Sequence, residues 1–263
     1  MEQPVMTVSG TNFGKAADDY GTFRAGFPDS IFDYLADFNI GKPNQVVVDL
    51  GTGTGTLARG FALRGCKVIG VDPDPRMIGE AKKLDRQQKA TISYVEAKAE
   101  STGLDSAAAD VVTAGQCWHW FNQPRAVAEA IRLLKPGGKL VIANFDWLPS
   151  AGNVVEATEE LIMRYNPDWH FGGGSGRYPQ YLPVLREAGL QDIQTFSYDI
   201  DVLYTPEAWR GRIRASAGVA ALDADSTRRF DTDHLELLAS VFPMSVLAVP
   251  HRVFAIVAES VDR

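Results

Sequence analysis

Short apolar runs alternate with helix-like runs between residues 45 and 144, and this alternation constrains the fold more than any other feature of the sequence. Apolar runs of this kind are typical of parallel sheets whose two faces are both covered by helices. Strands are predicted at 45–50, 67–72, 91–96, 109–115 and 139–144, and helices at 30–38, 56–64, 76–89 and 124–134. The pattern predicts an α/β fold with a doubly wound, mostly parallel sheet.

The regular alternation of predicted strands and helices ends after residue 147. Helices are predicted at 154–165, 179–188, 205–217 and 231–241, strands at 194–204 and 245–258, and a glycine-rich loop at 170–178. No crossover helix follows residue 246, which predicts an antiparallel strand at one edge of the sheet. We interpret 1–263 as a single domain, with a cofactor-binding half at 30–147 and a helical cap at 150–178 and 205–241 over the substrate site.

Composition narrows the range of partners. The chain has 263 residues, 45% of them hydrophobic, and a net charge of −7 without any long basic run. Nucleic acids and anionic membranes attract basic surfaces, so neither is the expected partner.

Cys66 and Cys117 are interpreted as reduced thiols, and no secretory signal is seen, so a cytoplasmic monomer or homodimer is expected. The four histidines are scattered, and no metal site is predicted.

The segment VVVDLGTGTGTLARG places Asp49 near the end of the first predicted strand, and Gly51, Gly53 and Gly55 directly after it. Glycine accepts positive φ, so such a loop can turn tightly and bring its backbone close to a ligand. Ligands of open parallel sheets bind beyond the carboxyl ends of the strands. Asp72 ends the second predicted strand, where an acid can accept hydrogen bonds from both hydroxyls of a ribose. A nucleoside-containing cofactor is therefore predicted.

Two cofactor classes fit this outline. The dinucleotide fingerprint Gly-x-Gly-x-x-Ala is satisfied from Gly53 to Ala58, which keeps an NAD(P)-dependent oxidoreductase as an alternative. That register leaves Asp49 and Gly51 without a role, and an acid at the end of the strand would repel a pyrophosphate. A sulfonium cofactor that carries an ammonium group has no phosphate to repel.

The run Asp-x-Gly-x-Gly-x-Gly resembles the first motif of the class I S-adenosylmethionine-dependent methyltransferases. KVIGVDPDPRMI, YVEAKAESTGL, DVVTAGQCWHWF and LLKPGGKLVIANF resemble the elements that follow in that family, in the same order, from about residue 45 to residue 145. The resemblance implies a Rossmann-like methyltransferase fold and S-adenosylmethionine as the cofactor. FGKAADDYGTFRAGFP and the C-terminal part are similar to small-molecule members, including the trans-aconitate methyltransferase-like group.

The resemblance also implies which residues bind the cofactor. Asp72 would hold the ribose, Pro73 and Met77 would flank the adenine, and Tyr20 and Arg24 would close over the cofactor. Lys98 departs from the family pattern, because many relatives carry an acid there against the adenine amino group. The full predicted set is Tyr20, Arg24, Asp49, Gly51, Gly53, Gly55, Asp72, Pro73, Met77, Ala99, Glu100 and Gln116.

His119, in WHWF after the fourth predicted strand, is the candidate catalytic base, because a neutral imidazole can take a proton from a hydroxyl or an amine. A packing role is the alternative, since an ionised carboxylate acceptor needs no base and reacts through proximity and alignment. Trp118 and Trp120 alternate, so at most one faces the pocket, and Trp120 is assigned to substrate binding. Arg210 is a candidate for binding a carboxylate, against the alternative of a solvated basic helix face.

The sequence thus predicts S-adenosylmethionine-dependent methyl transfer to a small-molecule acceptor by in-line displacement. Oxygen is the expected acceptor atom, a carboxylate included, and nitrogen or carbon remain open. A cofactor-binding protein without catalysis is a third interpretation, which would bind the cofactor and show no turnover.

Overall fold

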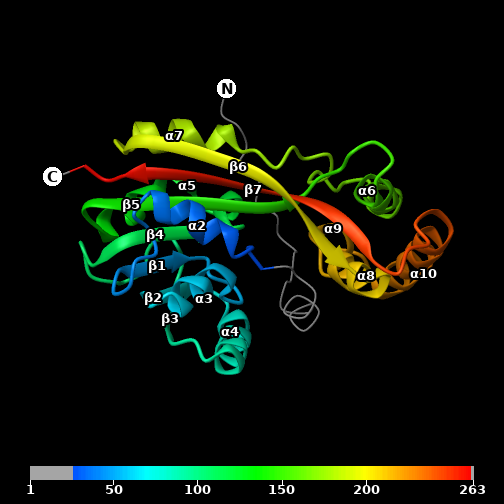
Figure 1. The fold of residues 1–263 in the computed structure, drawn as a ribbon, viewed down its shortest axis with the longest axis horizontal. Coiled ribbons are helices and arrows are strands. Elements are labelled where there is room, and N and C mark those ends of the chain that lie inside the picture. Colours follow the sequence, from blue (N-terminus) through cyan, green and yellow to red (C-terminus); the bar gives the residue numbers. More distant parts are fainter. Residues whose placement is uncertain (1–25, 262–263) are drawn as a thin grey trace. The chain divides into compact units, whose positions relative to one another are not determined.

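The computed structural model describes residues 26–261 (Figure 1). Within this range the chain divides into two compact units, which are described separately. The sheet unit comprises 26–147, 176–200 and 250–261, and the helical unit comprises 148–175 and 201–249. Across residues 26–261, no helix is both long enough and apolar enough to cross a membrane. That the helical segments cover a substrate site stays a prediction.

The helices and strands follow the predicted order, with boundaries that move by a few residues. The strands are β1 (Val46–Leu50), β2 (Lys67–Asp72), β3 (Ile92–Glu96), β4 (Ala109–Gly115), β5 (Leu134–Trp147), β6 (Gln191–Tyr204) and β7 (Leu247–Glu259). The helices are α2 (Ser30–Asp37), α3 (Thr56–Leu63), α4 (Pro75–Gln88), α5 (Gln123–Leu133), α6 (Val154–Tyr165), α7 (Leu182–Glu187), α8 (Pro206–Arg214), α9 (Ala217–Ala220) and α10 (Ala224–Val241), with short 3-10 turns at Trp118–Trp120 and Pro179–Tyr181.

In the part of the chain that the structure describes, the strands form one sheet in the order β3-β2-β1-β4-β5-β7-β6. β1 pairs in parallel with β2 and β4, and β4 pairs in parallel with β5. β7 runs antiparallel to β5, from Lys139 opposite Glu259 to Trp147 opposite His251. The predicted α/β class and antiparallel strand are confirmed. The strand order reverses between β1 and β4, so the loops after these two strands meet at the switch point where ligands bind.

Side-chain caps explain where several helices begin. Asp74 precedes α4 and accepts a hydrogen bond from the backbone N–H of Arg76, while Pro75 occupies the first turn, where its missing N–H costs nothing. Asn122 caps α5 through the N–H of Arg125 in the same way. Both caps follow directly on loops at the carboxyl side of the sheet, so they also fix the path of the chain there.

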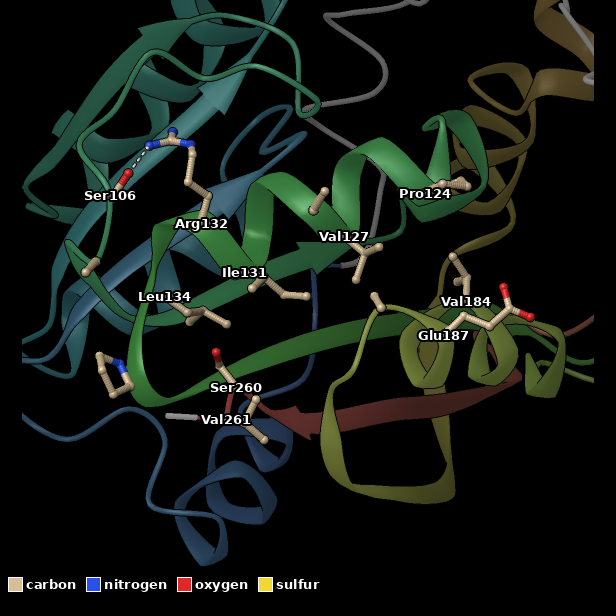
Figure 2. A pocket seen from close by; sticks show the side chains of 14 residues that line it. Ser106, Pro124, Val127, Ile131, Arg132, Leu134, Val184, Glu187, Ser260 and Val261 are labelled. Atoms are coloured by element: carbon tan, nitrogen blue, oxygen red, sulfur yellow. Dashed lines mark hydrogen bonds between the residues drawn. The ribbon is translucent and has the colours of Figure 1, made fainter. Parts of the chain in front are cut away.

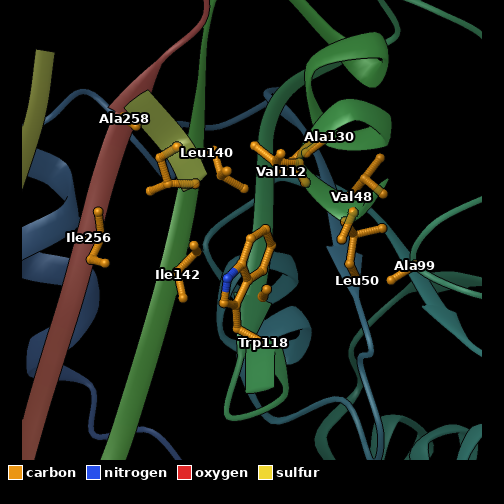
Figure 3. Close-up of a cluster of buried hydrophobic side chains, with 14 of the residues drawn as sticks. Val48, Leu50, Ala99, Val112, Trp118, Ala130, Leu140, Ile142, Ile256 and Ala258 are labelled. Carbon is orange, nitrogen blue, oxygen red and sulfur yellow. The ribbon is translucent and has the colours of Figure 1, made fainter. Parts of the chain in front are cut away.

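The core of the sheet unit lies between the sheet and helices α5 and α7. Leu140 and Ile142 of β5 share this core with Val112 of β4 and Ile256 of β7 (Figure 3). Trp118, which is fully buried, belongs to the same cluster. Because Trp118 follows β4 by three residues, the core anchors the segment that leaves the end of this strand.

The helical unit differs in two places from the prediction. The predicted helix at 205–217 is divided into α8 and α9, and α10 begins at Ala224, seven residues before the predicted start at 231. Asp223 explains the early start, because its carboxylate accepts a hydrogen bond of 2.8 Å from the N–H of Ser226 and so caps the helix.

Inside the helical unit, His234 of α10 is fully buried beside Thr158 of α6. The Thr158 hydroxyl donates to the carbonyl of Val154, so it accepts from Trp209 Nε1 and from His234 Nε2. Burial, and next the nearby charge of Arg210, lower the pKa of His234 from 6.5 to about 4. His234 is therefore a neutral core residue at physiological pH.

Candidate functional site

The loop after β1, residues 51–55, is called the glycine loop, and its three glycines adopt a backbone conformation that other residues rarely adopt. Gly51, Gly53 and Gly55 have φ values of +62°, +56° and +78°. A Cβ on Gly51 would lie 2.8 Å from Phe121 and 2.9 Å from Cys117 Sγ, so only glycine fits there. Next to Gly53, in contrast, the nearest atom is Met77 Cε at 3.5 Å. The loop is closed on the side of Gly51 and has space above Gly53.

Asp72 stands at the end of β2 with its carboxylate turned toward this loop. Gly53 N–H donates to Oδ2 at 2.8 Å, and Asp74 N–H donates to Oδ1 at 2.9 Å. Asp74, and not Asp72, caps α4, so the Asp72 carboxylate is not used for the helix terminus. A carboxylate has about four acceptor sites, so Asp72 can accept further hydrogen bonds from a ligand. Burial raises the pKa of Asp72.

Asp49 lies deeper, under the glycine loop. Both of its oxygens accept hydrogen bonds of 2.6 Å, Oδ2 from the Thr52 hydroxyl and Oδ1 from the Thr113 hydroxyl. Burial is the largest cause that raises its pKa from 3.8 to about 6, and the charge of Asp72 adds to it. A cationic ligand above the loop would favour the charged form of Asp49.

A buried ion pair supports the loop from below, and the sequence interpretation missed it. Arg59 Nε lies 2.9 Å from Asp85 Oδ1, and both side chains are less than 10% exposed. Arg59 Nη2 also donates to the carbonyl of Thr54 at 2.7 Å, and the Tyr94 hydroxyl donates to Asp85 Oδ2. The guanidinium thus ties the glycine loop to α4 and β3. No motif joins these residues, since they come from α3, α4 and β3.

The residues predicted to surround the adenine come from the turns after β2 and β3. Met77 is buried beside Gly53, and Pro73 is exposed. Ala99 is buried, while Glu100 Oε1 accepts the N–H of Asn122 and so links the turn after β3 to the cap of α5. Lys98 forms a bridge with Ser101 within that turn. Their assignment to the adenine stays a prediction.

Gln116, directly after β4, has the unusual φ of +60° for a residue with a side chain. Its Nε2 donates to the Phe145 carbonyl and, at 3.1 Å, to Asp146 Oδ1. The next residue, Cys117, donates from Sγ to the carbonyl of Leu50 at 3.1 Å. The end of β4 is therefore joined to the ends of both β1 and β5.

The residues assigned to catalysis and substrate lie in different units. His119 and Trp120 are exposed on the 3-10 turn after β4, with ring centroids 4.6 Å apart, while Trp118 is buried. Arg210 lies in the helical unit, where it pairs with Glu207 and Asp231, and Arg214 pairs with the same two acids. The basic helix face is thus largely neutralised by neighbouring acids. The roles of these residues stay predictions, and Tyr20 and Arg24 lie outside the described residues.

A cavity of about 610 Å³ lies elsewhere in the sheet unit (Figure 2). Val127 and Ile131 of α5, Val184 of α7 and Val261 line it, together with Leu134, where β5 begins. At its rim Arg132 donates to Ser106 Oγ at 3.0 Å. It contains none of the predicted site residues. Among residues 26–261, no cluster of three metal-ligating side chains occurs.

Comparison with known proteins identifies the domain. Residues 48–142 match the family model of a methyltransferase domain. An uncharacterized methyltransferase of Mycobacterium tuberculosis is 31% identical over 150 residues, which cover 55% of this chain and 58% of that protein. The chain thus spans little more than half the length of such curated relatives. A ubiquinone biosynthesis O-methyltransferase of Xanthomonas oryzae is 28% identical over 175 residues, which cover 65% of this chain and 70% of that protein.

A solved structure shares the fold. Phosphoethanolamine N-methyltransferase 2 of Haemonchus contortus, in complex with phosphomonomethylethanolamine and S-adenosylhomocysteine, superimposes with a TM-score of 0.59 at 20% identity, covering 97% of this chain and 61% of that chain. The matched residues 48–142 contain the glycine loop, Asp72 and Gln116. Residues 48–142 thus match a methyltransferase domain, and they carry the motifs that resemble the class I S-adenosylmethionine-dependent methyltransferases.

Proposed function

We propose that this protein transfers a methyl group from S-adenosylmethionine to a small-molecule acceptor, with oxygen as the favoured receiving atom and nitrogen as the alternative. The observation that carries the proposal is the contact between Gly53 N–H and Asp72, because it places an acid with spare acceptor sites beside a loop of three left-handed glycines. The net charge of −7 supports a small molecule over a nucleic acid as the acceptor.

The residues at this loop fit the cofactor. Asp72 would accept hydrogen bonds from the ribose hydroxyls, and the apolar Met77 and Ala99 would contact the adenine. Asp49 supplies negative charge below the loop, which suits a ligand with a sulfonium and an ammonium group and opposes a pyrophosphate. When bound, the cofactor supplies an electrophilic methyl group.

The chain itself contributes orientation. Arg59 fixes the loop from below through the Thr54 carbonyl, and Gln116 fixes the segment that leaves β4 through its bonds to residues near the end of β5. Holding the acceptor atom in line with the methyl group supplies the entropic part of catalysis. The relative from Xanthomonas oryzae, which is named as an O-methyltransferase, supports oxygen as the acceptor atom.

Calorimetric titration with S-adenosylhomocysteine and, in parallel, with NADH tests the cofactor. We expect one-to-one binding of S-adenosylhomocysteine and no binding of NADH. Binding of NADH alone would show that the register from Gly53 to Ala58 binds a dinucleotide. Binding of S-adenosylhomocysteine without any turnover of S-adenosylmethionine in the presence of acceptors would instead indicate a cofactor-binding protein without catalysis.

A further inference from the structure

A row of hydrogen-bonded polar side chains crosses the carboxyl ends of β4 and β5. Asn144 Nδ2 donates to Gln116 Oε1 at 3.1 Å, and Gln116 Nε2 donates to Asp146 Oδ1 at the same distance. The Tyr178 hydroxyl donates to Asp146 Oδ2 at 2.7 Å. Asp146, Gln116 and Tyr178 are partly exposed, whereas Asn144 is buried. Asp146 therefore lies at the accessible end of this row of side chains, where Gln116 orients Oδ1 and Tyr178 orients Oδ2.

The orientation of both amides follows from their surroundings. Gln116 Nε2 faces two acceptors, the Phe145 carbonyl and Asp146, so Gln116 Oε1 must face Asn144. The amide nitrogen of Asn144 must then point to Gln116 and its Oδ1 away from it. Among residues 26–261 this buried Oδ1 finds no hydrogen-bond partner. A buried acceptor of this kind is expensive unless a ligand or water supplies a donor.

The backbone at this position is strained. Gln116 has φ of +60°, and a residue with a Cβ in this region costs free energy that the surrounding contacts must offset. Here the offset comes from the side-chain bonds to Phe145 and Asp146 and from the bond of Gln116 N–H to the Ala143 carbonyl at 2.9 Å. Such strain is typical of residues that are held for a function at a site.

The cluster adjoins the glycine loop. Cys117 follows Gln116 in the chain, its Sγ contacts the Leu50 carbonyl, and a Cβ on Gly51 would lie 2.9 Å from the same sulfur. Asp146 is thus connected to the glycine loop through the hydrogen bond from Gln116 and through the contact of the adjacent Cys117 with Leu50 and Gly51. A small molecule that meets the cofactor at the ends of β1 and β4 would reach Asp146 in the last residues of β5.

We infer that Asp146 binds the acceptor of the methyl group and takes its proton, and that the acceptor carries a hydroxyl or an amine at the receiving atom. This inference rests on the proposed function. The acceptor oxygen or nitrogen forms a bond to the methyl carbon, the carbon–sulfur bond breaks with its electron pair on sulfur, and the proton passes to the Asp146 carboxylate and on to solvent. Asn144 Oδ1 and the Asp146 carboxylate favour an acceptor that brings a proton to share over an ionised carboxylate.

The class of acceptor can be tested before its identity is known. The protein is incubated with S-adenosylmethionine carrying a deuterated methyl group and a fractionated metabolite extract, and labelled products are detected by mass spectrometry before and after mild alkali. Alkali cleaves methyl esters and leaves methyl ethers and methylamines intact, so we expect the label to survive on oxygen or nitrogen. A label that alkali removes, or one on carbon, overturns the inference. Binding of S-adenosylhomocysteine without any labelled product would overturn the transfer function itself.

The role of Asp146 is tested with the acceptor found in this way. Asp146→Asn keeps the size and one acceptor oxygen but lowers the affinity for a proton, so kcat should fall by about a hundredfold or more. The dissociation constant for S-adenosylhomocysteine should stay within about threefold of the original, which separates this role from a merely structural one. Asp33→Asn, on the exposed face of α2, is the matched control.

Two further variants sharpen the result. Tyr178→Phe removes the hydroxyl that orients Asp146 and keeps the carboxylate, so it should raise KM more than it lowers kcat. His119→Ala changes the other candidate base. If His119→Ala abolishes turnover while Asp146→Asn retains it, or if Asp146→Asn loses cofactor binding and turnover in the same proportion, Asp146 is not the group that receives the proton.

Discussion

The backbone N–H of Gly53 donates a hydrogen bond of 2.8 Å to the carboxylate of Asp72, across the gap between the loop after β1 and the end of β2. This contact orients the acid that we expect to hold the ribose, and it ties the most open part of the loop to the neighbouring strand.

Replacing Asp72 by alanine should therefore weaken binding of S-adenosylhomocysteine by more than about tenfold, because two hydrogen bonds to a charged group are worth well over 1.4 kcal/mol. Calorimetric titration measures the effect, and circular dichroism checks that the variant is folded. Asp74→Ala is the control, since it removes the cap of α4 and the exposed pair with Arg76 and should cost about 1 kcal/mol of stability. Unchanged affinity in folded Asp72→Ala would refute the ribose assignment.

Asp49 predicts a pH dependence of stability with a definite sign. Its pKa is raised by burial from 3.8 to about 6 in the folded state, so the folded state holds the proton more tightly than the unfolded state. The free energy of unfolding that Asp49 contributes in this way is fully present below about pH 3.8 and is lost as the pH rises through about 6. The loss amounts to about 3 kcal/mol. Urea unfolding of Asp49→Asn and the original protein, compared between about pH 4 and about pH 7, should show this difference. Parallel pH profiles would contradict it.

The ion pair of Arg59 and Asp85 predicts a large effect of a single substitution. Arg59→Met leaves the Asp85 carboxylate buried without its cation, and such a change costs about 3–5 kcal/mol. Adding Asp85→Asn removes the uncompensated charge, so the double variant should unfold at a higher urea concentration than Arg59→Met alone. Equal midpoints for the two variants would show that the pair is not electrostatically coupled.

Two glycines in helices predict opposite responses to the same substitution. A Cβ on Gly60 of α3 would lie 1.9 Å from the ring of Phe32, whereas a Cβ on Gly79 of α4 meets nothing within 4 Å. Gly60→Ala should cost about 1–3 kcal/mol through overpacking. Gly79→Ala should stabilise the protein by about 0.5–1 kcal/mol through helix propensity. Thermal unfolding measures both, and a stabilised Gly60→Ala would mean that α2 and α3 can separate without cost.

The sequence was sufficient for the sheet and for the part of the site that depends on local signals. Val46 to Val48 is an apolar run that continues into Asp49 and Leu50, and the end of this strand, together with Asp72, predicted where the loop and the acid meet. Glycine at alternate positions predicted left-handed backbone, and all three glycines have positive φ. These features depend on one stretch of chain and on the rule for parallel sheets, so they can be recognised without a structure.

The remaining parts depend on contacts between distant residues. Tyr94 lies nine residues from Asp85, and the third member of the group, Arg59, is on another helix, so no spacing indicates that they meet. The left-handed backbone of Gln116 depends on acceptors that arrive with β5. The pairing of Arg210 and Arg214 with Asp231 likewise depends on the packing of α10 against α8.

The close approach of Cys117 to Gly51 has a practical consequence. Cys117 is 8% exposed and lies between the ends of β1 and β4. Cys66 is 7% exposed and directly precedes β2, at the opposite end of the strands. Because Cys117 Sγ lies against Gly51, any movement of the glycine loop would change how readily a thiol reagent reaches Cys117. Cys66, remote from the loop, would serve as the reference thiol in the same labelling experiment.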